Sequence, residues 1–198
     1  MTITPKRLGV KFSLKQAPRL QPDDILPIFQ RWIQEHTVEG MLIDVIDYKH
    51  VPDGPGVILI ADEADYAYDL ADGQVGLHYI RKRDLPDDFA AALRLVFHGA
   101  LLGAQALEAE APADLIFDYS AAKINFLDRM HYRNEPNIFA NVSDEITDIM
   151  RDIYGAAVSV VRVNEDPRRL FAVRVEALSD DHDLDDISRR LSASRQSA

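Results

Sequence analysis

The sequence predicts an α+β fold in which three helices pack on a mostly antiparallel sheet. Short runs rich in β-branched and aromatic residues follow one another over connections too short for crossover helices, so consecutive strands pair in opposite directions. Longer segments with apolar residues at helical spacing separate these groups of strands. The expected order is strand, helix, four strands, helix, two strands, helix, two strands.

The N-terminal part is expected to form one strand and one helix. Residues 8–15 alternate between apolar and polar side chains, which indicates a strand with one buried face. A helix begins near Asp24, because aspartate caps a first turn well and Pro27 then falls where a helix tolerates proline. Gly40 marks the end of the helical pattern.

A meander of four strands follows the first helix. Turn sequences such as Asp72-Gly73 separate the runs, and connections this short join only antiparallel neighbours. The expected strands are Met41–Asp47, Gly56–Ala61, Asp65–Leu70 and Val75–Lys82.

The longest predicted helix begins at Pro86 and extends to Glu110. Gly99 and Gly103 lie four residues apart on it, and small residues at that spacing let another backbone approach closely. We expect tight packing of this helix on its own sheet, with a helix pair across a dimer interface as the alternative.

The C-terminal half is expected to contain one more helix and four more strands. Asn141 or Ser143 would cap the helix, and Gly155 would end it. The expected strands are Leu115–Asp118, Ile124–Arg129, Ala157–Val163 and Leu170–Ala177. Residues 1–178 thus form a single domain, and the charged residues 179–198 are expected to be a mobile tail.

Composition excludes several classes of protein. The 198 residues include no cysteine, so there is no disulfide, no iron–sulfur cluster and no thiol nucleophile, which fits the cytoplasm. The formal net charge of −11 disfavours nucleic acid as a partner. The longest apolar stretch, residues 89–107, contains Arg94, His98 and Gln105, so no membrane span is expected.

The charge is unevenly distributed along the chain. Residues 1–20 carry basic side chains and no acid, whereas the middle of the chain is strongly acidic. We expect attraction between the basic first strand and its acidic neighbours within the fold. The alternative is a basic edge that recruits an acidic protein or a second copy of the chain.

Residues 119–123 match two enzyme motifs in spacing alone. Tyr119 and Lys123 have the Tyr-x-x-x-Lys spacing of short-chain dehydrogenases, and Ser120 and Lys123 have the Ser-x-x-Lys spacing of serine β-lactamases. The chain lacks both the G-x-G-x-x-G loop and the K-T-G motif that these chemistries require. We interpret both matches as chance.

A basic segment in this acidic chain is the candidate ligand-binding site. Arg129, His131, Arg133 and Asn134 precede the third predicted helix. Arginine binds carboxylate and phosphate groups through two hydrogen bonds at once, and a helix N-terminus adds backbone donors. An anionic small molecule or acidic peptide is the expected ligand; alternatively, the arginines neutralise nearby acids.

The segment 44–72 is rich in aspartate and offers a second hypothesis. Carboxylates that meet at one end of the meander could hold Mg²⁺ or Ca²⁺, with Asp47 in a hydrolase site. Turns and solvated strand faces favour aspartate for structural reasons, so we expect no metal and no cofactor.

These observations lead to three hypotheses about function. The first is a soluble, cytoplasmic, non-enzymatic module that binds a protein partner or assembles with itself, for example as a homodimer. The second is an enzyme or sensor that holds an anionic small molecule near Arg129–Asn134. The third is a divalent-metal hydrolase built on residues 44–72. Nucleic acid and membrane are not expected as partners.

Overall fold

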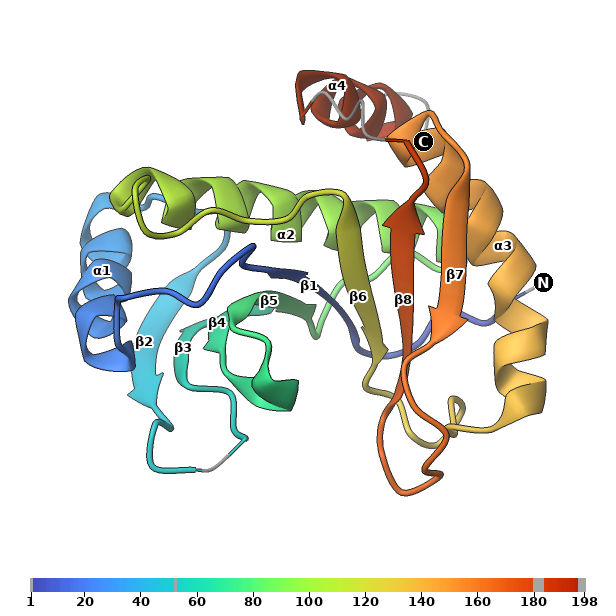
Figure 1. Cartoon of the computed structure of the whole chain (residues 1–198), viewed down its shortest axis with the longest axis horizontal. Helices are drawn as coiled ribbons and strands as arrows, with labels where there is room; N and C mark the ends of the chain where they lie inside the picture. The colour runs from blue at the N-terminus through green and yellow to red at the C-terminus, as the bar shows by residue number, and fades with distance from the viewer. Residues whose placement is uncertain (1, 52, 180–183, 196–198) are drawn as a thin grey trace.

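Eight antiparallel strands form one sheet in the order β2-β3-β4-β5-β1-β6-β8-β7. This computed structural model describes residues 2–51, 53–179 and 184–195 (Figure 1). The strands are β1 (Leu8–Ser13), β2 (Leu42–Asp47), β3 (Val57–Ala61), β4 (Ala64–Asp69), β5 (Gly76–Arg81), β6 (Ala121–Phe126), β7 (Val158–Arg162) and β8 (Phe171–Ala177). The helices are α1 (Pro22–Glu35), α2 (Phe89–Glu110), α3 (Pro136–Tyr154) and α4 (Leu184–Arg195). The predicted α+β class is confirmed.

The order of elements repeats around the central β1–β6 pair. The first unit is β1-α1-β2-β3-β4-β5-α2, and the second, shorter unit is β6-α3-β7-β8-α4. In each unit the first strand pairs with the strand before the last helix, β1 with β5 and β6 with β8. In each, the first helix packs on the outermost strand, α1 on β2 and α3 on β7. The molecule is thus two related halves joined antiparallel between β1 and β6.

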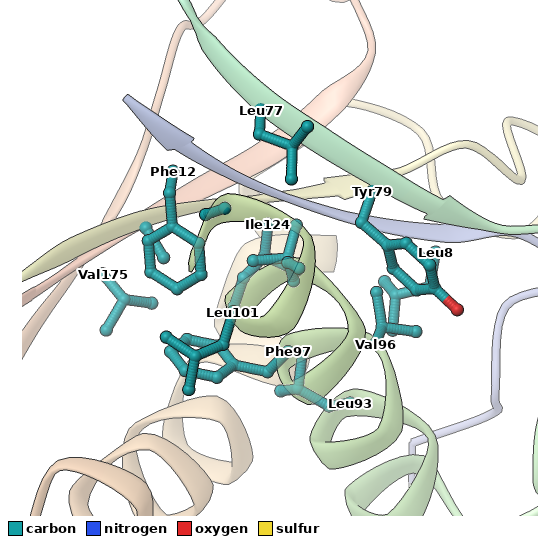
Figure 2. Packing of buried hydrophobic residues seen from close by; sticks show 14 of the residues in the cluster. Leu8, Phe12, Leu77, Tyr79, Leu93, Val96, Phe97, Leu101, Ile124 and Val175 are labelled. Carbon is teal, nitrogen blue, oxygen red and sulfur yellow. The ribbon is translucent and has the colours of Figure 1, made fainter. Parts of the chain in front are cut away.

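The helices cover one face of the sheet and build the core there. Figure 2 shows apolar side chains of α2, among them Phe97 and Leu101, packed against strand residues such as Phe12 and Ile124. The α2 glycines permit this close contact, because a Cβ at Gly99 would lie 2.6 Å from the Tyr79 ring. The predicted tight packing of this helix on its own sheet is confirmed.

The apolar character of α2 has a structural explanation. Within the described residues, α2 is the one helix long and apolar enough to cross a membrane by length and composition. Half of its apolar window is buried inside the fold, where α2 lies on β1 and β5 and contacts α3 and α4. The apolar composition of α2 is therefore that of a helix at the centre of the domain core.

Several boundaries differ from the sequence prediction. Of the expected strand at 115–118, the structure shows one isolated bridge between Phe117 and Leu14. The third helix begins at Pro136, because proline at the first helical position fixes a suitable φ after the extended Glu135. The basic first strand lies between β5 and β6, so it is not an edge that could pair with a second copy.

The largest difference lies in the predicted tail. Residues 184–195 form the fourth helix, which packs against both α2 and α3. Its Ile187 and Leu191 are each 1% exposed. Arg190 of this helix also donates a hydrogen bond to the carbonyl of Ile153 near the end of α3. The helix is thus part of the domain, although residues 180–183 and 196–198 of the same predicted tail lie outside the described residues.

Docking of α4 predicts a stability difference between two identical substitutions. Leu191→Ala should lower the free energy of unfolding by about 2–4 kcal/mol, because it removes a fully buried side chain. Leu102→Ala on α2 is the matched control, since Leu102 is 38% exposed, and should cost less than about 1 kcal/mol. Urea unfolding measures both values. If both substitutions lower the free energy of unfolding by the same small amount, α4 does not pack on the domain as described.

Candidate functional site

The uncovered face of the sheet has a buried ion pair at its centre. Lys11 points to this face because it alternates with the core residues Val10 and Phe12 on β1. Its Nζ lies 2.8 Å from Oδ2 of Asp69 at the end of β4, and the two residues are 2% and 7% exposed. Burial lowers the pKa of the Lys11 ammonium, and the Asp69 carboxylate opposes this effect. Desolvating two charges is costly, so such a pair depends on further hydrogen bonds to its remaining polar atoms.

His78 and Asn125 extend the pair into a network. His78 lies opposite Lys11 on β5, and Asn125 Nδ2 lies 3.1 Å from His78 Nε2. The other ring nitrogen, Nδ1, lies 3.9 Å from Asp69 Oδ2, so the ring is close to this carboxylate but beyond hydrogen-bond distance from it. Burial lowers the pKa of His78 to about 4, so the ring is neutral at pH 7. Gly9 makes room for it, because a Cβ there would lie 2.4 Å from Nε2.

The buried pair also fixes a turn above the sheet. Lys11 Nζ donates to the carbonyl of Ala71 over 3.2 Å, and the Ala71 amide donates to Asp69 Oδ1 over 3.1 Å. These bonds hold the single helical turn Ala71–Gly73 in place. Its central residue, Asp72, has a left-handed φ of 62° and pairs with Lys123 of β6. The hydrogen bond from Lys123 lowers the pKa of the Asp72 carboxyl.

Two adjacent cavities lie on this face, with volumes of about 510 and 400 Å³. Both are lined by Ala71, Asp72 and Lys123, so they adjoin at the Asp72–Lys123 pair, and together they are called the groove below. Their volumes are typical of sites for small molecules.

The charge of the groove is opposite to that of the protein. Eight basic and four acidic residues line the groove, whereas the whole chain has 22 basic and 33 acidic residues. The basic residues are Lys11, Lys15, Lys123, Arg129, Arg162, Arg168, Arg169 and Arg174, and the acidic ones are Asp53, Asp69, Asp72 and Asp118. Within the described part of the chain, Lys15 and Arg129 are exposed and form no ion pair. The groove therefore suits an anion.

The structure brings one of the four sequence-predicted site residues to the groove. Arg129 lines the second cavity, and its Nη2 donates to the Arg168 carbonyl over 2.9 Å. The other three, His131, Arg133 and Asn134, do not line either cavity. His131 is half-exposed, with Nδ1 2.9 Å from Asp128 Oδ2.

Asn134 has a positioning role beside the groove. Its side chain is 2% exposed, and its amide nitrogen lies 2.8 Å from both Asn164 Oδ1 and the Asp166 carbonyl. These contacts hold the β7–β8 loop, which carries Arg168 and Arg169 to the second cavity. Asn134 therefore acts on the groove through that loop.

Sequence reasoning did not identify Lys11, His78 and Lys123 as site residues. The alternating pattern of residues 8–15 correctly predicts that Lys11 lies on the polar face of a strand. Its neighbours on that face come from β5 and β6, which are distant in the sequence. Register pairs Lys11 with His78 on one side and with Lys123 on the other. No local pattern reveals this register, although a lysine on the first strand of an acidic protein is a weak signal.

The acidic segment 44–72 distributes its carboxylates over separate partners. The ion pairs are Asp47–Lys49, Asp53–Arg169, Asp62–Arg83, Asp65–Lys82, Asp69–Lys11 and Asp72–Lys123. Within the described ranges, no group of three or more histidine or acidic side chains is placed to hold a metal ion. The structure thus offers no support for the metal-hydrolase hypothesis.

The Tyr-x-x-x-Lys match is also separated in space. The Tyr119 hydroxyl donates to Glu108 Oε2 over 2.7 Å and its ring packs on the core residue Phe12. Burial and this bond raise the pKa of Tyr119. Lys123 instead pairs with Asp72 in the groove. The two side chains serve different parts of the fold, as expected of a chance match.

Comparison with known proteins adds nothing to these observations: no family model, curated protein or solved structure matches the chain.

The buried ion pair predicts a large cost for removing one partner. Lys11→Met should destabilise the protein by about 3–5 kcal/mol, because it leaves the Asp69 charge buried without its cation. Adding Asp69→Asn should restore part of this loss. Lys123→Met, which breaks a partly exposed pair, is the control and should cost about 1 kcal/mol or less. Denaturant unfolding at pH 7 measures all four proteins; a Lys11→Met value near the control would refute the account.

His78 predicts a pH dependence of stability. A histidine whose pKa is lower in the folded state favours folding above its ordinary pKa of 6.5, and this contribution disappears as the pH falls toward about 4. The loss should be on the order of 3 kcal/mol. His78→Gln should flatten the curve between these pH values, because glutamine does not titrate. Chemical unfolding across this range tests it, and parallel curves would contradict a buried neutral His78.

Proposed function

We propose that the protein is a non-enzymatic binding module whose groove takes a small anionic molecule. The observation that carries this proposal is the twofold excess of basic over acidic residues in the groove of a protein with the opposite balance. Low-dielectric walls strengthen the attraction between these cations and an anion compared with open solvent.

The polar chemistry of the groove favours binding over catalysis. His78 Nε2 lies 3.1 Å from Asn125 Nδ2, and burial lowers the pKa of the ring to about 4, so His78 is poorly placed as a general base near neutral pH. Lys11 is 2% exposed and engaged with Asp69, which argues against a nucleophilic amine. Lys15 and Arg129 are exposed in the groove and form no ion pair within the described residues, and cations of this kind hold a ligand by charge and hydrogen bonds.

The proposal modifies the site expected from the sequence. Arg129 keeps its expected ligand-binding role, and Asn134 supports it through the β7–β8 loop. His131 and Arg133 are outside the proposed site. We also retain a cytoplasmic location, because a chain without cysteine suits a reducing compartment. Self-association stays a prediction, and it would have to use a surface other than the β1 strand.

Titration calorimetry with inorganic phosphate and glutarate tests the groove. Lys123→Met should weaken anion binding at least about tenfold, since it removes a cation shared by both cavities. Lys82→Met is the matched control, because Lys82 also pairs with an aspartate but does not line the groove. Arg129→Ala should weaken binding and Arg133→Ala should not. The proposal fails if the wild-type protein binds neither anion at about 10 mM, or if Lys82→Met loses as much affinity as Lys123→Met.

A further inference from the structure

We infer that the Asp72 carboxylate occupies the position where the groove holds a ligand's own carboxylate, so that Asp72 is a built-in competitor of the ligand. This inference rests on the proposed function, and it assigns both the chemical class of the ligand and the regulation of its site.

The position of Asp72 marks the most favourable place for an anion in the groove. Asp72 and Lys123 are where the two cavities adjoin. The Asp72 carboxylate is paired with Lys123 and is also attracted by Lys11 and Arg169. A free carboxylate at this point would meet the same three cations.

The Asp72–Lys123 pair is not needed to hold the turn. Lys11 and Asp69 fix the backbone of Ala71, and the Asp72 amide donates to Asp53 Oδ1 over 2.5 Å. The ion pair itself is partly solvated, with side-chain exposures of 45% for Asp72 and 25% for Lys123. Partly exposed pairs contribute little to stability, so a ligand can replace this one at low cost.

Displacement requires only a side-chain movement. Lys11 and Asp69 hold the backbone of the turn at Ala71, and the Asp72 side chain itself is 45% exposed. The carboxylate can therefore swing away from Lys123 while the backbone stays in place. Lys123 then donates its hydrogen bonds to the ligand, and the groove exchanges an internal anion for an external one.

The chemistry of Asp72 also indicates the class of ligand. A carboxylate already satisfies Lys123 at this point, so a ligand carboxylate fits without rearrangement of the cations. Removing the internal carboxylate should raise the affinity for a carboxylate ligand, because the ligand no longer displaces a bound group or faces its negative charge.

Calorimetric titration of glutarate into the full chain tests this inference. Asp72→Asn should bind glutarate about fivefold more tightly than the wild-type protein. Asp118→Asn is the matched control, because it removes the same charge from a residue lining the first cavity that does not pair with Lys123. It should raise affinity by less than Asp72→Asn. In a Lys123→Met background, Asp72→Asn should give no more than the control effect.

The outcomes separate this inference from the proposed function. If the wild-type protein binds glutarate and Asp72→Asn binds equally or more weakly than Asp118→Asn, the inference is wrong and the anion groove stands. If the wild-type protein binds neither glutarate nor phosphate at about 10 mM, the proposed function is wrong. If Asp72→Asn strengthens phosphate binding more than glutarate binding, the assignment of the ligand as a carboxylate is wrong.

Discussion

The buried Lys11–Asp69 ion pair organises the uncovered face of this protein. It lies on the central strand β1 and the end of β4, and both partners are almost fully removed from solvent. A buried pair of charges is costly unless further hydrogen bonds satisfy its remaining atoms. Here Ala71 accepts from Lys11 and donates to Asp69, and His78 lies against the same carboxylate. The charge pair therefore determines the shape of the turn that follows β4.

That turn connects the stability of the fold to the chemistry of the groove. It presents Asp72 toward Lys123, and so separates the two cavities with an ion pair that is much more exposed than the one below it. Breaking the buried Lys11–Asp69 pair costs much stability, so this pair supports the fold. Breaking the partly exposed Asp72–Lys123 pair costs little, and this is the pair that we propose a ligand replaces. Two chemically identical lysine–aspartate contacts thus differ in role because they differ in burial.

The sequence was sufficient to predict the fold class because the relevant signals are local. Alternation in β1 and the short turns of the meander require no knowledge of distant contacts. The helix α4 was not predicted, since Ile187 and Leu191 lie in a polar segment and become buried only against α2 and α3. The predicted strand at 115–118 is reduced to one bridge beside the end of β1, where the Lys15 amide donates to the Ile116 carbonyl and the Asp118 amide donates to the Ser13 carbonyl.

The candidate site was less predictable because its residues come from separate strands. Arg129 was found because it belongs to a visible basic segment of an acidic chain. Lys11, His78 and Lys123 become neighbours only through the β5-β1-β6 register, which depends on the whole sheet. A solvated strand face and a groove floor have the same alternating pattern, so the sequence alone does not distinguish them.

The repeated topology explains why the groove lies where it does. β1 and β6 begin the two related halves and meet antiparallel at the centre, where they supply Lys11 and Lys123 to the floor. The first half contributes the Asp72 turn to one side of the groove, and the second contributes the β7–β8 loop to the other. The contacts Lys123–Asp72 and Arg169–Asp53 both join one half to the other. The proposed ligand position at Asp72 therefore lies where the two halves of the molecule meet.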